Sequence, residues 1–286
     1  MIDLHTHTTA SDGRLSAAEL VGRAAAAGIT TLAVTDHDTV ASCAPAEDAC
    51  RHAGITFVAG IEITAMREGR DVHVLAYFFD YGSPELLALL AEQRRNRIAR
   101  ARQMMDKLAQ HGIALNEDEI LRPALVDQSR AVGRPWIARA LVSAGHVATT
   151  NEAFDRWLSR GQPAFVVRVG PSPAAVASCV HDAGGVASIA HPGLLERDDW
   201  LQDFARDGVD ALEAFHSRHD ADTTARYLAR AVRLGLAVSG GSDYHADDSH
   251  GPDQLGVVHL PTEYYDRLAA RRPTSRATAS GAETSS

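Results

Sequence analysis

Short apolar runs alternate with longer stretches of helical spacing along most of this chain. The short runs are rich in β-branched and other apolar residues, and they predict seven strands, at positions 2–4, 31–35, 56–60, 72–78, 186–190, 210–215 and 236–240. Regular alternation of strands with helices is typical of a parallel α/β fold. Because no GxGxxG turn follows these strands, we expect a barrel-like closure rather than a dinucleotide-binding sheet.

Several of the intervening helices carry recognisable start and stop signals. Ser16 and Glu19 form a capping box before an alanine-rich helix that Gly28 ends. Gly54 closes the next helix, and Gly235 closes one that begins at about Asp222. A helix commonly ends in the left-handed conformation, which glycine adopts without steric cost, so these glycines mark helix ends.

Residues 81–161 break the alternation and have the pattern of helices alone. One helix is expected from Pro84 to near Gly112 and a second from about Asn116, with Glu119 as its capping partner. Two more are expected at 135–145 and 152–160. We therefore predict a helical cap at 81–161, inserted into a barrel made of residues 1–80 and 162–270. Residues 271–286, rich in Ser, Thr and Ala, are predicted to be a disordered tail.

The composition is that of a folded globular protein. Hydrophobic residues make up 45% of the 286 and charged residues 23%. No apolar run approaches the roughly 20 residues of a membrane span, and the N-terminus lacks the basic and apolar regions of a secretory signal. The three cysteines, Cys43, Cys50 and Cys179, have no CxxC spacing. We therefore expect a cytoplasmic protein without disulfides.

Charge and histidine content narrow the class of ligand. A formal net charge of −9 argues against wrapping a long nucleic acid. A small anionic substrate stays compatible with it, because bound divalent cations would reverse the local field in one cleft. Fourteen histidines is a high number for this length and points to metal. We expect neither a membrane nor a protein partner.

Unusual polar residues stand at or near the ends of the predicted strands. His5 and His7 follow the first strand two residues apart, so their side chains point the same way, and Asp12 lies in the next loop. The other groups are TDH at 35–37, GxE at 60–62, His73 in the fourth strand, AHP at 190–192 and SDxH at 242–245. Since α/β barrels assemble their active sites at the C-terminal ends of strands, we expect these groups to converge.

The converging groups are of the kinds that bind transition metals. A lone histidine or a single HxH pair is a weak signal, but the whole set is hard to attribute to chance. The nine candidates exceed what one tetrahedral ion can use, so two or three divalent ions are expected, with Mn2+, Fe2+ or Zn2+ all acceptable. They are His5, His7, Asp12, His37, Glu62, His73, His191, Asp243 and His245. Paired metals can clamp a phosphoryl group during in-line displacement by an activated hydroxide.

HxH, TDH, GxE, AHP and SDxH, in this order over about residues 1–250, resemble the motifs of the PHP family, the polymerase and histidinol phosphatase metal hydrolases. The resemblance implies a distorted (β/α)7 barrel with up to three divalent metals. It assigns His5, His7 and Asp243 to a first ion, and Glu62 as a bridge to a second ion held by His73 and His191. Asp12, His37 and His245 would hold the third. No ligand position is substituted, which argues against a metal-free accessory module.

Within the family, the helical insert and residues 133–141 resemble the branch of small nucleotide phosphatases. That branch acts on AMP or 3′,5′-nucleoside bisphosphates, and some members trim short oligonucleotides from the 5′ end. The resemblance implies that Arg134 reaches from the cap to the substrate phosphate and that His219 also approaches it. Glu62, Asp243 and His219 are the expected catalytic residues. One departure is Gln162, where relatives often carry lysine, and it leaves the identity of the ester open.

Other polar residues have competing interpretations. His216 is expected to be a polar loop residue without a role. Asp36 and Asp38 flank a predicted ligand and either orient it or cap the following helix. The basic run at Arg94, Arg95, Arg97, Arg100 and Arg102 is expected to form a solvated helix surface. Part of it could instead hold the second phosphate of a bisphosphate or a short oligonucleotide.

The expected activity is hydrolysis of the phosphomonoester of a small nucleotide by a metal-activated hydroxide. The alternatives are a 5′-3′ exonuclease or phosphodiesterase on short oligonucleotides, and a histidinol phosphate phosphatase, against which the nucleotide-type cap counts. An amidohydrolase of the HxH type fits the early TDH and the late SDxH badly.

Overall fold

The computed structural model describes residues 1–127, 132–246 and 255–273. Its seven strands form one sheet in the order β1 to β7. They are β1 (Ile2–Asp3), β2 (Thr31–Val34), β3 (Thr56–Arg67), β4 (Arg70–Tyr77), β5 (Val186–Ile189), β6 (Ala211–His216) and β7 (Ala237–Gly241). The N–H of Leu4 donates to the carbonyl of Gly240 at 3.2 Å, and Thr6 bridges to Tyr244. The first and last strands therefore meet, and the predicted seven-stranded barrel is confirmed.

The expectation of a fully parallel sheet is wrong at β4. This strand runs antiparallel to both β3 and β5, while the other neighbours are parallel. Glu68 and Gly69, both at positive φ, turn the chain directly from β3 into β4, and such turns match the twist of a tight hairpin. β3 therefore continues to Arg67 instead of ending at Gly60 as predicted. His73 lies early in β4, opposite Thr64, rather than at a C-terminal strand end.

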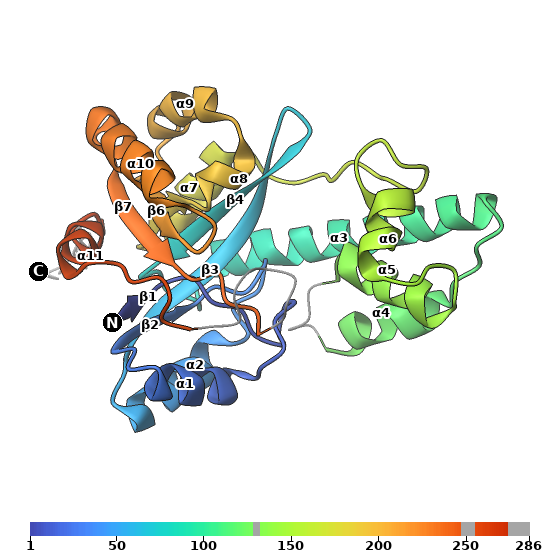
Figure 1. The fold of residues 1–286 in the computed structure, drawn as a ribbon, viewed down its shortest axis with the longest axis horizontal. Helices are drawn as coiled ribbons and strands as arrows, with labels where there is room; N and C mark the ends of the chain where they lie inside the picture. The colour runs from blue at the N-terminus through green and yellow to red at the C-terminus, as the bar shows by residue number, and fades with distance from the viewer. Residues whose placement is uncertain (128–131, 247–254, 274–286) are drawn as a thin grey trace, which may run out of the picture.

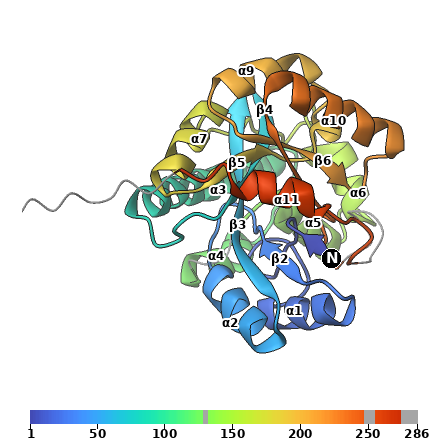
Figure 2. The ribbon, with the colours of Figure 1, turned by 90° about the vertical axis from the view of Figure 1, so that its left-hand side faces the viewer.

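The predicted helix signals around the barrel are confirmed. Ser16 caps α1 (Ala17–Ala26) with the full capping box to Glu19. Gly54 and Gly235 end α2 (Cys43–Ala53) and α10 (Ala221–Leu234) in the left-handed conformation. The other helices of this part are α7 (Pro173–Asp182), α8 (Pro192–Leu195), α9 (Leu201–Arg206), the 3-10 turn η2 (Asp198–Trp200) and α11 (Thr262–Ala269). They surround the sheet, as Figure 2 shows.

The remaining helices lie to one side of the barrel (Figure 1). They are α3 (Pro84–Gln110), α4 (Glu117–Val126), α5 (Arg134–Ser143) and α6 (Thr150–Ala153), which continues as a π-helical turn, η1 (Phe154–Leu158). The helix expected at 152–160 is thus short and changes its winding. Long α3 begins against the barrel and reaches the other helices (Figure 1). Most of the predicted tail, residues 274–286, lies outside the described residues.

The barrel and the helices beside it are packed around two separate apolar clusters. Buried strand residues such as Tyr77 and Leu75 pack with barrel helices in one cluster. A second cluster contains only residues between Ile98 and Ala164, among them Met104 and Leu108 of α3. The helices beside the barrel therefore have a core of their own, except at the start of α3, where Leu86 and Leu90 pack in the barrel cluster. Across the described residues, no helix is both long enough and apolar enough to cross a bilayer.

Candidate active site

Glu62 stands at the centre of a ring of imidazoles. Its buried carboxylate approaches five histidines, with its Oε1 2.7 Å from His73 Nδ1 and 3.0 Å from His191 Nε2. Its other oxygen, Oε2, lies 3.3 Å from the Nε2 of both His5 and His7 and 3.1 Å from Nδ1 of His37. β3 positions this residue because the strand continues past the end of β2. One carboxylate thus touches groups from β4 and from the segments after β1, β2 and β5.

Two further carboxylates complete the cluster. Asp243 Oδ1 lies 3.3 Å from His5 Nε2 and 3.2 Å from His7 Nε2. Asp12 lies 3.3 Å from His245 Nε2 and 3.6 Å from His37 Nε2. The structure therefore brings all nine predicted ligands into one connected group. It places the ligand atoms of His5, His7, Glu62 and Asp243 within 4.8 Å of one another, and likewise those of His7, Asp12, His37 and His245 and those of His37, Glu62 and His73.

The backbone is strained where it presents these side chains. His191 has φ 28° and Asp243 has φ 56°, values that residues with a Cβ seldom adopt. A hydrogen bond stabilises the strained conformation of Asp243, because its backbone N–H donates to the carbonyl of His5 at 2.8 Å. Gly241 allows that approach, because a Cβ at this position would lie 2.3 Å from the nitrogen of His5. Strained residues of this kind are typical of functional sites.

Acidic residues outside the predicted set orient the cluster. Glu213 of β6 accepts a hydrogen bond from His5 Nδ1 at 2.9 Å and from the backbone N–H of His191 at 2.7 Å. With Nδ1–H donated to Glu213, the lone pair of His5 Nε2 points into the cluster. Sequence reasoning missed Glu213, although a glutamate inside an otherwise apolar predicted strand was an available signal, and the structure buries it fully.

The expectation that His216 lies in a loop is wrong. It is the last residue of β6, its side chain is fully buried, and its Nε2 lies 3.4 Å from Asp243 Oδ2. A register shift between Glu213 and Phe215 alters the alternation of the strand. Glu213 and His216 therefore face the same side despite an odd spacing, which a regular period of two does not predict.

Asp36 and Asp38 have positioning contacts and cap no helix, since the N-cap of α2 is Ser42. Asp36 accepts hydrogen bonds from Thr8 N–H and from the hydroxyls of Thr8 and Ser11. These bonds fix the loop between His7 and Asp12. Asp38 accepts the N–H of Thr64 at 2.7 Å and pairs with arginines. The capping alternative is therefore wrong, and the orienting role of the two residues stays a prediction.

The charge states within the cluster suit metal binding. Burial alone would raise the pKa of Glu62, but His37, His73 and His5 hold that pKa well below its usual range. The same competition lowers the pKa of Asp12 and of Asp243, so all three carboxylates are ionised at neutral pH. Burial lowers the pKa of His37 to about 3. Against its burial, the hydrogen bond and charge of Asp12 raise the pKa of His245 to about 9.

Divalent ions fit this donor set. Both ring nitrogens of His7 and Nδ1 of His37 are buried without a hydrogen bond to any described residue. Leaving buried polar atoms without partners is costly, and a cation would supply the partner. A metal would also take the place of protons that the carboxylates otherwise hold on His5 and His245. The imidazole and carboxylate donors are those used by Mn, Fe and Zn.

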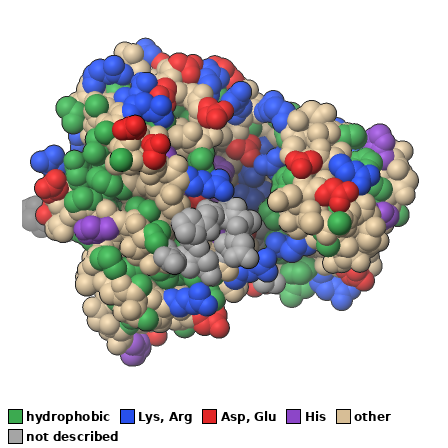
Figure 3. Space-filling model, in the orientation of Figure 1, with side chains coloured by type: hydrophobic (Ala, Val, Ile, Leu, Met, Phe, Trp, Pro, Cys, Tyr) green, Lys and Arg blue, Asp and Glu red, His purple; other side chains and the backbone are tan. Residues whose placement is uncertain are grey.

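Arginines gather next to the cluster, in the hollow between the barrel and the helices beside it (Figure 3). Arg97 donates to Asp38, Arg168 lies 3.4 Å from the same carboxylate, and Arg134 lies 3.8 Å from Asp71. The expectation of a solvated arginine surface holds for Arg102, which pairs with exposed Glu117. It is wrong for half-buried Arg97 and buried Arg100, because residues 93, 97 and 100 share the face of α3 that turns to the barrel.

These arginines outnumber the carboxylates that they contact. Arg97, Arg134 and Arg168 pair with only two carboxylates, Asp38 and Asp71. Arg100 and Arg134 line a cavity of about 360 Å3 next to Asp71, together with Arg70 and Arg160. Burial, together with Arg97, lowers the pKa of Arg168 to about 9, and burial with Arg134 lowers that of Arg100 to about 10. A half-buried excess of positive charge favours an anion at this place.

The other predicted substrate residue has a different environment. Nε2 of His219 accepts the N–H of Gly193 at 3.3 Å, and Nδ1 donates to the carbonyl of Ala214 at 3.0 Å. The ring thus supports the turn that follows His191. Contact of His219 with a substrate phosphate stays a prediction. Gln162 forms backbone hydrogen bonds in a turn, and its segment supplies Arg160 to the arginine cavity instead, while Arg168 pairs with Asp38 and Asp71 beside it.

Comparisons with known proteins agree with this geometry. The PHP domain family matches residues 3–121. A 5′-3′ exoribonuclease of Haemophilus influenzae is 38% identical over 85% of this chain and 89% of its own length. A 3′,5′-nucleoside bisphosphate phosphatase of Chromobacterium violaceum is 36% identical over 91% and 92%. A solved metal-dependent phosphoesterase of Bifidobacterium adolescentis is 32% identical, with a TM-score of 0.84 over 96% of each chain. The likeness covers the barrel and the helices beside it alike.

Proposed function

Because the chain belongs to the PHP family of metal-dependent phosphoesterases and hydrolyses phosphate esters, we propose that its substrate is a small nucleotide with two phosphates. In this proposal the protein hydrolyses one of the two phosphomonoesters of a 3′,5′-nucleoside bisphosphate. This substrate fits the site better than AMP does. The relative from Chromobacterium violaceum carries this activity in its name.

The observation that carries the proposal is the contact between two unlike clusters. Asp71 and His73 lie two residues apart on β4, so their side chains share one face at a separation of about 7 Å along the strand. His73 belongs to the imidazole and carboxylate cluster, and Asp71 to the arginine cavity. One nucleoside with two phosphates can span this distance, with the reacting phosphate at the first cluster and the other at the second.

The first cluster would hold two or three divalent ions, with Mn2+, Fe2+ and Zn2+ as candidates. Such ions supply a nucleophile at neutral pH and offset charge on the phosphoryl oxygens. In this proposal His5, His7 and Asp243 would hold one ion, and Glu62, His73 and His191 would hold the second. The third ion would be held by Asp12, His37 and His245. Glu213 and Asp36 keep the ligand side chains in place through the hydrogen bonds described above.

The second cluster would bind and orient the phosphate that does not react. A guanidinium presents a planar fork that matches two phosphate oxygens. Arg134, at the first turn of α5, is the least buried of the four arginines and faces the cavity with Arg100 and Arg160. Arg168 supports it from the other side through Asp71. The helices at 84–158 would then act as a cap that completes the substrate site.

The test compares a nucleoside 3′,5′-bisphosphate with AMP, using manganese-loaded protein and measuring release of inorganic phosphate. Arg168→Gln and Arg134→Gln should each lower kcat/KM for the bisphosphate by about 10- to 100-fold, as expected for hydrogen bonds between charged groups. Their effect on AMP should be smaller. Arg102→Gln is the matched control, because it removes the same guanidinium from α3 at a position that pairs with exposed Glu117 and does not line the arginine cavity.

Equal losses for both nucleotides in the Arg168 and Arg134 variants would remove the second phosphate from the proposal. Hydrolysis of simple phosphate esters without hydrolysis of any nucleotide would overturn the nucleotide assignment itself.

A second candidate is the removal of nucleotides from the 5′ end of a short oligonucleotide. The exoribonuclease relative carries this activity in its name. In the structure it is favoured by a further open cavity beside Asp12, described below, which could receive a neighbouring nucleotide. A labelled five-nucleotide RNA separates the two candidates, because only the second yields successively shorter products. Histidinol phosphate is the weakest alternative, since it lacks a second phosphate for the arginines.

A further inference from the structure

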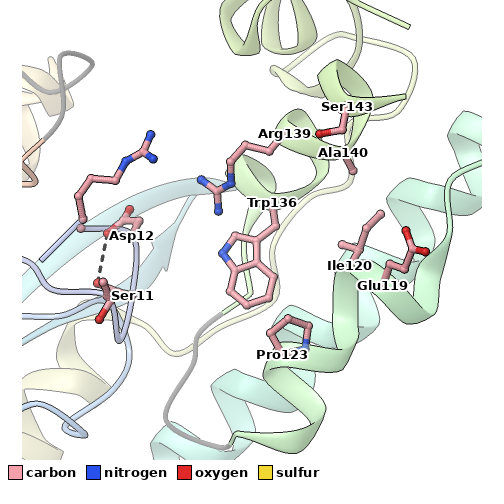
Figure 4. A pocket seen from close by; sticks show the side chains of 12 residues that line it. Ser11, Asp12, Glu119, Ile120, Pro123, Trp136, Arg139, Ala140 and Ser143 are labelled. Carbon is pink, nitrogen blue, oxygen red and sulfur yellow. Dashed lines mark hydrogen bonds between the residues drawn. The ribbon is translucent and has the colours of Figure 1, made fainter. Parts of the chain in front are cut away.

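A cavity of about 490 Å3 opens on the opposite side of α5 from the arginine cavity. One wall is the loop with Ser11 and Asp12, and the other is formed by α4 and α5 (Figure 4). Asp12 is one of the nine predicted metal ligands, so the cavity begins at the cluster itself. A volume of this size is typical of sites for small organic ligands.

The face of α5 that lines this cavity has a composition suited to a flat, polar ring. Trp136, Arg139, Ala140 and Ser143 follow the helical spacing i, i+3, i+4, i+7 and so lie on one side. Figure 4 shows the indole of Trp136 pointing into the space between the Asp12 loop and Pro123 of α4, with the guanidinium of Arg139 extending toward that loop. Arg134 is two positions before Trp136 and faces the arginine cavity instead.

The opposite wall is held in place before any ligand binds. Asp36 anchors Thr8 and Ser11 by hydrogen bonds, and the N–H of Arg14 donates to the carbonyl of His245 at 2.9 Å. Gly13 lets this loop pack on the backbone of His7, since a Cβ would lie 2.5 Å from the His7 carbonyl oxygen. The indole is equally fixed, because Trp136 packs against the core of the helices at 98–164. A rigid slot of this kind loses little entropy on binding.

We propose that this cavity binds the base of the nucleotide, which stacks on the indole of Trp136 while Arg139 and Arg14 contact its polar edge or its sugar. This assignment rests on the proposed function, because it takes the substrate to be a nucleotide. Stacking on an aromatic face accepts every base, so the site selects for the presence of a base and not for its identity. Helix α5 then contacts the substrate with two of its faces. Arg134 on one face binds a phosphate, and Trp136 on the other binds the base.

The experiment compares a nucleotide with a phosphate ester that has no base. AMP and ribose 5-phosphate are hydrolysed by the manganese-loaded protein, and the ratio of their kcat/KM values is measured. In Trp136→Ala this ratio should fall by about 5- to 150-fold, the usual loss when one base loses its aromatic platform. Trp136→Phe keeps a ring and should recover most of the ratio. Leu125→Ala is the matched control, since Leu125 is an exposed apolar residue of α4 outside the cavity.

A second readout needs no catalysis. Adenosine should quench the tryptophan fluorescence of the wild-type protein, and that quenching should be absent from Trp136→Phe. Trp136→Ala could instead lower kcat/KM for a dinucleotide while leaving that for AMP unchanged. The base that stacks on Trp136 would then belong to the neighbouring nucleotide, and this result would still support the stacking site.

The stacking site is overturned if Trp136→Ala leaves kcat/KM relative to ribose 5-phosphate unchanged both for AMP and for the dinucleotide. If the wild-type protein still hydrolyses nucleotides in that case, the proposed function survives it. If the wild-type protein hydrolyses ribose 5-phosphate but no nucleotide, the proposed function fails first, and the stacking site fails with it.

Discussion

At the scale of single residues, the predicted ligands are held by buried neighbours outside the nine predicted positions. Glu213 accepts hydrogen bonds from the ring of His5 and the backbone of His191, and both residues are predicted to hold different ions. Burial opposes its ionisation, but the charges of His5, His216 and His191 lower its pKa. A single buried carboxylate therefore fixes the geometry of two ligands that are far apart in sequence.

Glu213→Gln tests this orienting role with little change in shape. The amide keeps the volume but loses the charge that favours the correct form of His5. We expect metal affinity or activity to fall by about 10- to 100-fold, the usual effect of removing a group that orients a metal ligand. Metal content by elemental analysis and phosphate release measure it. A variant with unchanged metal affinity and activity, and an unchanged melting temperature, would contradict the role.

His181 and Asp210 make a pair away from the active site, with His181 Nε2 2.8 Å from Asp210 Oδ2. The hydrogen bond to Asp210 raises the pKa of His181 above its ordinary value of 6.5. A raised folded-state pKa contributes stability that is fully present below the unfolded pKa and is lost as pH rises through the folded pKa.

The wild-type protein should therefore exceed His181→Gln in unfolding free energy at pH 6, by no more than about 1 kcal/mol for a pair this exposed. The difference should shrink as pH rises above 7. Urea unfolding across this pH range measures it. A difference that grows with pH would contradict the sign of the shift.

At the scale of elements, the join between β1 and β7 decides whether the ligands on it meet. β1 is only two residues long, and Asp3, His5 and Gly241 pack against one another at the join. The N–H of Ser242 donates to Asp3, whose burial raises its pKa to about 6. The backbone at Gly241 must therefore approach His5 more closely than any residue with a Cβ allows.

Gly241→Ala should open this join. We expect a loss of about 1–3 kcal/mol or more in unfolding free energy, as for forced overpacking, together with weaker metal binding. Gly22→Ala is the matched control, because Gly22 lies inside α1 and a Cβ there meets nothing within 4 Å. That change should stabilise the protein by about 0.5–1 kcal/mol. Unfolding in urea gives both values, and equal stability of Gly241→Ala and wild type would contradict the packing argument.

Local signals in the sequence predicted most elements but not the direction of β4. Capping residues and terminal glycines mark α1, α2 and α10 because their effect is confined to one helical turn. The reversal at Glu68–Gly69 was missed because the expected alternation placed a helix between every pair of strands. His73 still reaches the site, since the start of an antiparallel β4 lies beside the continued β3.

At the scale of the whole molecule, the convergence of eight of the nine predicted ligands could be expected from the sequence, because strand ends in a barrel meet whatever lies between them. His73 is the exception, since it reaches the same cluster from within antiparallel β4. Glu213 and His216 could not be expected there, because a register shift in β6 hides their common direction. The arginine cavity was equally hidden. It depends on how α3, α5 and the segment around Arg168 pack against β4, and composition alone made Arg97 and Arg100 resemble a solvated surface.

The same packing separates the barrel from the helices beside it, and each part contributes different residues to the site. The barrel has one apolar core and carries the imidazole and carboxylate cluster, while the helices at 84–158 have their own core and contribute Arg134 and Trp136. In our proposals chemistry takes place on the barrel, and substrate selection takes place between the barrel and these helices.

The most direct test of the central claim is a manganese titration of chelated protein, which follows bound metal and phosphate release from a nucleoside 3′,5′-bisphosphate together. Activity should be absent without metal and should rise as two to three ions bind per chain. Glu62→Gln, which removes the charge at the centre of five imidazoles, should lower both metal occupancy and activity. Full activity in chelated protein that holds no metal would contradict the account.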